Sequence, residues 1–142
     1  MYTIDTSVFI NAVEPHEQDH AASRQLLGLL RARQISVIVP TLVTVEVAGA
    51  VSRLRDNARA QRLTEILLRL RMVSFVSLDD PLARQAAALA AAHRLRGADA
   101  VYAAVSQQFA TTLVSRDREH LTRLSGIIPV LHPVVALAAL AS

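Results

Sequence analysis

Short apolar runs alternate with longer amphipathic stretches along the whole chain. Leucine and alanine recur at helical spacing in the longer stretches, for example over residues 16–33, which is typical of helices that pack one face on a sheet. Strands that alternate with helices form a parallel sheet with helices on both faces. We therefore predict an α/β fold of one domain over residues 1–142, with three α/β/α layers around a central parallel sheet of about four to five strands. The predicted strands are the apolar runs 1–5, 35–39, 73–78, 111–115 and 127–131.

Aspartate, proline and glycine mark the expected ends of several helices. Asp79-Asp80-Pro81 is typical of a helix start, and this helix is predicted to run to about Arg96, where Gly97 ends it. Asp56 is expected to cap the helix that follows it directly in the sequence. Residues 42–55 are predicted to be helical in spite of their β-branched content, because the run is too long for a strand.

The C-terminal stretch 124–142 carries no formal charge. Pro129 and Pro133 interrupt it, so we predict a strand followed by a small apolar helix over 134–140, and no membrane span. That helix either closes the core of the domain or serves a homodimer. The N-terminus has no basic segment before its first aspartate, so we expect no signal peptide and a cytoplasmic location.

Arginine supplies all 15 basic residues, and the chain has no lysine and no cysteine. This composition excludes disulfides, cysteine nucleophiles and cysteine-bound zinc. It also excludes Walker-type nucleotide sites and Schiff-base chemistry, which need a lysine. The net charge of +3 is compatible with an anionic partner such as nucleic acid. The densest basic region is either a solvated face or a phosphate-contacting surface, and consists of Arg53, Arg55, Arg59, Arg62, Arg69 and Arg71.

Two acidic residues follow predicted strands directly. Asp5 ends the first strand, and Asp117 lies just past the strand 111–115. Because the carboxyl ends of parallel strands share one edge, both carboxylates are expected at the edge where open α/β sheets bind ligands. Taken alone, Asp5 is better explained as a helix N-cap.

Two more acidic residues lie early in apolar helices. Glu46 is the only charged residue in the first three turns of its helix, and Asp99 lies in the first turn of another. Buried carboxylates need partners. Glu46 could instead reach water or pair with an arginine, and Asp99 could simply complement a helix dipole. The alternative is that Asp5, Glu46, Asp99 and Asp117 converge on one site.

Four blocks of sequence carry a resemblance to the PIN domain. Asp5-Thr6-Ser7, the lone Glu46, the segment 97–104 and the segment 112–117 resemble the four signature blocks of this family, in order and over essentially the whole chain. The chain is most similar to compact ribonuclease toxins of the VapC type. This resemblance implies a PIN-like fold and a metal-dependent endoribonuclease. It also implies that Asp5 and Asp99 are the principal metal ligands, with Glu46 and Asp117 completing the catalytic site.

The chemistry of such a site agrees with this resemblance. Four carboxylates held within about 5 Å of one another would repel by roughly 3 kcal/mol per pair at an effective dielectric near 20, so protons or cations must accompany them. Hard oxygen ligands select Mg²⁺ or Mn²⁺ over zinc. Metal-assisted hydrolysis of an RNA phosphodiester is the expected reaction.

Polar residues near these acids could orient the carboxylates by hydrogen bonds. For each of these residues, a local turn or cap hydrogen bond is the alternative role. These residues are Thr6, Ser7, Asn11 and Ser115. The histidines show no metal-ligand spacing and no nucleophile partner, so we expect them at surface or interior positions without a catalytic part. They are His16, His20, His93, His120 and His132.

Two other classes of protein compete with the nuclease. An aspartyl-phosphate enzyme also places an acid after its first strand, but it needs a lysine near the phosphate, and this chain has none. The second alternative is a PIN-like module that binds RNA or protein without catalytic turnover. If the chain is a toxin, the resemblance implies RNA as the substrate, a small cognate antitoxin as the partner, and a homodimer as a further possibility.

Overall fold

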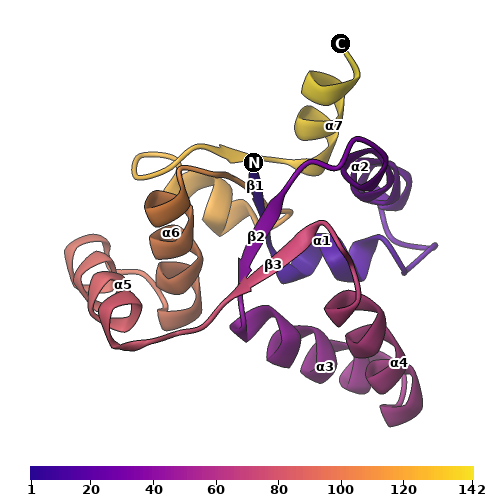
Figure 1. Cartoon of the computed structure of the whole chain (residues 1–142), viewed down its shortest axis with the longest axis horizontal. Helices are drawn as coiled ribbons and strands as arrows, with labels where there is room; N and C mark the ends of the chain where they lie inside the picture. Colours follow the sequence, from indigo (N-terminus) through magenta and orange to yellow (C-terminus); the bar gives the residue numbers. More distant parts are fainter.

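The computed structural model describes residues 1–142 and contains one sheet of five parallel strands (Figure 1). The strands lie in the order β3-β2-β1-β4-β5, so β1 is central and its neighbours are β2 and β4. The predicted parallel α/β sheet is confirmed, with five strands. Their bounds are β1 (Tyr2–Ile4), β2 (Val37–Pro40), β3 (Val73–Val76), β4 (Thr112–Val114) and β5 (Val130–Leu131).

Helices cover both faces of the sheet. In Figure 1, α5 and α6 lie to the left of the strands, whereas α1 to α4 lie to the right. A short π-helical turn over His120–Leu124 follows β4. The helices are α1 (Thr6–Asn11), α2 (His20–Ala32), α3 (Leu42–Leu54), α4 (Asn57–Leu68), α5 (Asp80–His93), α6 (Gly97–Phe109) and α7 (Pro133–Ala141).

The apolar run of β2 shows how the layers form. Side chains alternate between the faces of a strand, so Val37 and Val39 join the larger core, which includes residues of α1 to α4. Ile38 points the other way and packs with Leu82 of α5 and Val101 of α6. All three β2 side chains are buried, which explains the uninterrupted apolar sequence of this strand.

Helix α6 is the most enclosed helix, since every residue from Ala100 to Ser106 is buried. The prediction that Gly97 ends the preceding helix is wrong. Helix α5 stops at His93 because Arg94 adopts the left-handed conformation with φ 54°, and Gly97 instead opens α6. Aspartate caps are confirmed at both predicted positions, where Asp79 accepts from Leu82 N and Asp56 accepts from Arg59 N.

The C-terminal helix α7 packs against α2. Its Ala136 is fully buried in the larger core, so α7 does close the core of the domain. Val134 and Val135 remain 44% and 51% exposed, and a homodimer through this face stays a prediction. No helix is both long and apolar enough to cross a membrane.

Arginine side chains hold the connection between α1 and α2. Arg55 Nη2 donates to Glu14 Oε2 at 2.6 Å, and Arg59 Nη2 donates to the Val13 carbonyl at 3.4 Å. Arg116 donates from the other side to Glu17 Oε2, at 3.0 Å. Two arginines of the predicted phosphate-contacting surface are therefore already engaged within the protein.

We expect Glu14→Gln to lower the midpoint of thermal unfolding near pH 7 and to matter progressively less below about pH 4. The hydrogen bond from Arg55 holds the pKa of the Glu14 carboxyl below its ordinary value of 4.5. A lowered folded-state pKa stabilises the fold above the unfolded-state pKa, and this contribution is lost as the pH falls through the folded-state value. Glu65→Gln, at an exposed position of α4, is the control. An effect of Glu14→Gln that is equal at both ends of the pH range would contradict the ion-pair explanation.

Candidate functional site

Asp5 lies where β1 ends and α1 begins. It is 6% exposed, and its Oδ2 accepts hydrogen bonds from Ser7 N at 3.2 Å, Ser7 Oγ at 2.6 Å and Ser115 Oγ at 3.2 Å. The contact with Ser115 joins two neighbouring strands, because β1 pairs with β4 in parallel register. Asp5 is therefore both the N-cap of α1 and a member of a site that spans two strands.

Glu46 projects from the second turn of α3 toward α1 and α6. Its Oε1 accepts hydrogen bonds from Tyr102 OH at 2.8 Å and from Thr6 Oγ1 at 3.0 Å. The two hydroxyls also lie 2.9 Å apart. Burial raises the pKa of the Glu46 carboxyl, the two hydroxyl donors lower it, and the charges of Asp5 and Asp99 raise it again, with a net upward shift. Glu46 is therefore half-buried and held by two hydroxyls, and no arginine pairs with it.

Asp99 and Asp117 meet at His120. Asp99 Oδ1 lies 2.5 Å from His120 Nε2, and Asp117 Oδ2 lies 4.0 Å from the same nitrogen. Asp117 Oδ1 accepts from Glu119 N at 2.8 Å, which fixes the loop after β4. The imidazole therefore stands between one carboxylate from a helix and one from a strand end.

Ser115 connects these groups at the end of β4. Its buried hydroxyl donates to Asp5, lies 2.9 Å from His120 Nδ1, and accepts from Asp117 N at 3.0 Å. His120 Nδ1 is itself 3.9 Å from Asp5 Oδ2. A single hydroxyl thus holds Asp5, Asp117 and the imidazole that contacts Asp99.

The site has a strongly negative potential. Burial alone would lower the pKa of the His120 imidazole, but the carboxylates of Asp5, Asp99 and Asp117 outweigh it and raise that pKa. Burial, together with the charges of Asp5 and Glu46, raises the pKa of the Tyr102 phenol. Both shifts favour the form of the side chain that carries a proton, as expected where carboxylates crowd together.

Each of the four carboxylates uses one oxygen for its hydrogen bonds to the protein and leaves the other without a donor. The bonded oxygens are Oδ2 of Asp5, Oε1 of Glu46, and Oδ1 of both Asp99 and Asp117. None of the remaining oxygens is among the buried atoms that lack a partner, so each one reaches solvent. The free oxygens are Asp5 Oδ1, Glu46 Oε2, Asp99 Oδ2 and Asp117 Oδ2.

These donors fit a hard divalent cation in their chemistry, because carboxylate oxygens are the ligands that Mg²⁺ and Mn²⁺ prefer. No group of three or more acidic or histidine side chains already surrounds one point as a ligand set. Binding a cation would therefore draw the carboxylates closer together than they stand here.

Three of the four predicted outer residues contact the acids, namely Thr6, Ser7 and Ser115. The fourth, Asn11, is placed elsewhere. Its Nδ2 donates to Glu17 Oε2 and to the Gln18 carbonyl, both at 3.0 Å, so it ties the end of α1 to the following loop.

Two residues of the site were not predicted. His120 lies at an interior position, as expected for a histidine of this chain, but its contact with Asp99 places it among the acids, and Tyr102 was not assigned a role. The sequence holds only a weak indication of their roles. Tyr102 follows Asp99 by three positions, and His120 follows Asp117 by three, which is helical spacing. Their contacts to acids on other elements could not be read from that spacing.

A model of the PIN domain family matches residues 2–126. The chain belongs to the PIN domain family. The resemblance stated from four sequence blocks is thereby confirmed. The comparison with curated proteins gave no match.

Solved structures share this fold. VapC20 of Mycobacterium tuberculosis, described as a sarcin-ricin loop cleaving toxin, has a TM-score of 0.76 at 17% identity, over 90% of this chain and 97% of its own. A toxin–antitoxin complex from Klebsiella pneumoniae gives a TM-score of 0.68 at 18% identity, over 94% and 98% of the two chains. PAE2754 of Pyrobaculum aerophilum gives 0.70 at 23% identity, over 99% and 94%. At these identities the likeness shows the PIN fold.

We expect Ser115→Ala to lower the free energy of unfolding by about 1–3 kcal/mol, because Asp117 N and the buried His120 Nδ1 lose their partner. Urea unfolding measures this change. The control is Ser125→Ala. The exposed Ser125 hydroxyl donates only to the Thr122 carbonyl, so its loss is expected to change stability by less than about 0.5 kcal/mol. Equal effects of the two substitutions would show that the Ser115 hydroxyl does not organise the site.

Proposed function

We propose that this PIN-domain protein is a divalent-metal-dependent endoribonuclease that hydrolyses RNA phosphodiester bonds. The observation that carries the proposal is the set of four carboxylates, each held by one oxygen and open to solvent through the other. A binding module has no need of four crowded acids, because their repulsion opposes folding unless a cation joins them.

Mg²⁺ or Mn²⁺ is the proposed cofactor. Asp5 and Asp99 would be its principal ligands, and Glu46 and Asp117 would complete the site directly or through water. When bound, such an ion supplies an activated water and stabilises the charge that develops on the phosphate.

The remaining polar residues would keep the carboxylates in place for that ion. Ser7 and Ser115 hold Asp5 through Oδ2, so that Oδ1 faces outward. Thr6 and Tyr102 do the same for Glu46. His120 holds Oδ1 of Asp99 and leaves Oδ2 free, and it can keep a proton on Nε2 toward that carboxylate.

RNA is the proposed substrate, and the proposed role is that of the toxin in a toxin–antitoxin pair with a small cognate antitoxin. Support comes from the PIN fold shared with a toxin described as cleaving the sarcin-ricin loop and with a toxin–antitoxin complex. The competing function, a PIN-like module that binds RNA or protein without turnover, is an outcome of the following test.

We expect Asp5→Asn and Asp99→Asn each to lower the rate of RNA cleavage by at least about 100-fold, which is about 2.7 kcal/mol of transition-state stabilisation. The assay uses purified protein, a mixed pool of structured RNA, and Mg²⁺ or Mn²⁺ against a chelator. Asp80→Asn is the matched control, since Asp80 is an exposed acid that pairs with Arg84 outside the site, and this variant should cleave normally.

Divalent-ion binding is measured on the same proteins by calorimetry. If the wild-type chain neither cleaves RNA with any metal nor binds a divalent ion, the nuclease proposal fails and the binding module is left. Cleavage that survives both substitutions would assign the activity to a contaminant or to another site.

We expect Tyr102→Phe to weaken Mn²⁺ binding by about 10-fold to 100-fold, because Glu46 loses one of its two hydroxyl donors. Binding is followed by the electron paramagnetic resonance of free Mn²⁺, which does not depend on turnover. Tyr2→Phe, at the only other tyrosine of the chain, should bind Mn²⁺ normally. An unchanged affinity in Tyr102→Phe would show that the phenol does not position Glu46 for a cation.

A further inference from the structure

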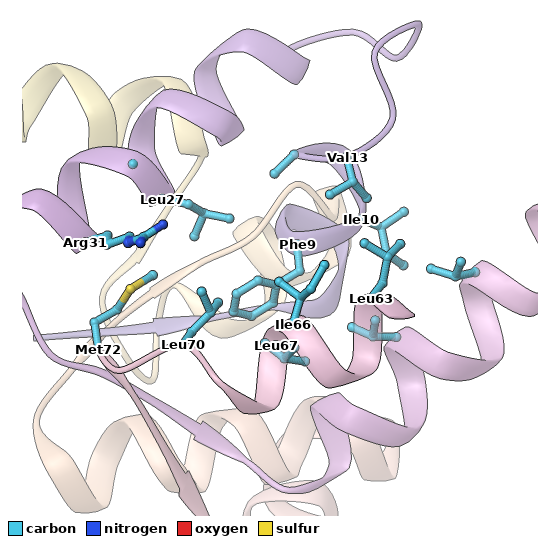
Figure 2. A pocket seen from close by; sticks show the side chains of 14 residues that line it. Phe9, Ile10, Val13, Leu27, Arg31, Leu63, Ile66, Leu67, Leu70 and Met72 are labelled. Carbon is cyan, nitrogen blue, oxygen red and sulfur yellow. The ribbon is translucent and has the colours of Figure 1, made fainter. Parts of the chain in front are cut away.

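A hollow opens at the amino ends of β2 and β3, at the edge of the sheet opposite to the four carboxylates. Ser36 and Met72, which line it, directly precede these two strands. Its volume is about 760 Å³, within the range of roughly 300–1,000 Å³ that is typical of small-molecule sites. Figure 2 shows Arg31, Leu70 and Met72 at one end of the neighbouring apolar pocket, and the hollow begins at these residues.

Three arginines from three separate segments line this hollow, which we call the arginine hollow. Arg31 lies in the last turn of α2, Arg69 directly follows α4, and Arg71 lies in the turn before β3. All three are exposed, and none forms an ion pair or a side-chain hydrogen bond within the protein, in contrast to Arg55 and Arg116. Their guanidinium groups are therefore available for bidentate binding of an anion such as phosphate.

The hollow concentrates positive charge without a compensating acid. No aspartate or glutamate lines it, so the three guanidinium groups repel one another unless an anion joins them. The dipole of a helix end accounts for a single cation such as Arg31 or Arg69, but Arg71 belongs to no helix. Ile66 and Leu70 line the same hollow, and low-dielectric walls around charges of one sign raise the potential that a counter-ion meets. The lining thus favours a ligand with several closely spaced negative charges.

Two uncharged donors complete the lining. Gln34, which has a φ of 53°, and Ser36 are both exposed, and neither side chain is hydrogen-bonded within the protein. An amide NH₂ and a hydroxyl can donate to phosphoryl oxygens as guanidinium groups do. Every polar side chain of the hollow therefore offers a hydrogen-bond donor.

We propose that the arginine hollow binds a compact polyphosphate group, with two or three consecutive phosphoryl units, either free or carried by a nucleotide. Arg31, Arg69 and Arg71 pair with the phosphoryl oxygens, and Gln34 and Ser36 donate to the oxygens that remain. Because the hollow lies at the opposite edge of the sheet from the carboxylates, the inference does not depend on nuclease activity.

The lining favours a compact polyphosphate over an RNA strand. A nucleic-acid backbone is bound by cations that are spread over a face or along a helix, whereas these three guanidinium groups line a single hollow. Single strands also stack their bases on aromatic rings, and no aromatic side chain lines the hollow.

The test is isothermal titration calorimetry of the full chain with sodium tripolyphosphate, ATP or inorganic phosphate, at low ionic strength and with a chelator. The chelator removes divalent ions, so the carboxylates cannot hold the phosphates through a metal. We expect one tripolyphosphate per chain, bound at least about tenfold more tightly than inorganic phosphate. Equal affinities for ATP and tripolyphosphate would identify the phosphoryl chain as the whole ligand, and a higher affinity for ATP would identify a nucleotide.

The variant that removes the cations is Arg31→Gln/Arg69→Gln/Arg71→Gln, and it should weaken tripolyphosphate binding at least about tenfold.

The matched control, Arg24→Gln/Arg53→Gln/Arg123→Gln, lowers the net charge by the same amount at exposed positions outside the hollow. Arg53 and Arg123 lie in the last turns of their helices, as Arg31 does, so the control also matches the loss of a cation at a helix end. Its affinity for tripolyphosphate should stay within about twofold of the wild type.

A second variant keeps all the arginines and blocks the hollow with a charge. Gln34→Glu places a carboxylate among the three cations, and should weaken tripolyphosphate binding about tenfold while the midpoint of thermal unfolding stays unchanged or rises. Gln25→Glu makes the same change at an exposed position of α2 outside the hollow, and should bind tripolyphosphate normally.

The proposal is overturned if the wild-type chain binds neither tripolyphosphate nor ATP, or if the two triple variants lose affinity equally, because the effect would then be one of net charge. It is also overturned if a structured RNA needs the three arginines for binding and tripolyphosphate does not compete with that RNA.

Discussion

Repulsion between carboxylates is the constraint on which the organisation of this protein depends. Three acidic side chains raise the pKa of His120, and two of them raise that of Glu46. Hydroxyl and imidazole groups from four different elements stabilise the carboxylates by hydrogen bonds. Because every donor engages a single oxygen of its carboxylate, the acids are held in place while the other oxygen of each stays without a donor.

The parallel sheet determines which groups can meet. Pairing of β1 with β4 sets Ile4 opposite Val114, so the residues that follow, Asp5 and Ser115, come into contact one position beyond the ladder. Helix α3 follows β2 on the other side of β1, and α6 crosses over β1, β2 and β4. The site is thus assembled at the edge where β1 and β4 end, with side chains from α3 and α6 reaching it.

The four acids could be predicted from the sequence because each has a local signature, either a strand end or the start of an apolar helix. The strands were recognisable for the same reason, as the buried apolar run from Val37 to Val39 illustrates. His120 could not be found in this way, because its role depends on a π-helical turn and on Asp99 in another element. Arg55 likewise pairs with Glu14, 41 residues away, and no periodicity reports such a contact.

Charge is separated along the strands, and this bears on how a polyanion could reach the acids. Arg31, Arg69 and Arg71 lie near the amino ends of β2 and β3. These strands are on the order of 13 Å long, which exceeds the Debye length of about 8 Å at physiological salt. Arg116, beside Asp117, is engaged with Glu17. These arginines therefore do little to offset the carboxylates at the opposite edge, and His120, whose pKa the acids raise, is the cationic group within the site. A bound divalent cation would offset the remaining negative charge where an RNA phosphate approaches Asp5 and Asp99, so under the proposed function the metal ion would serve binding as well as hydrolysis.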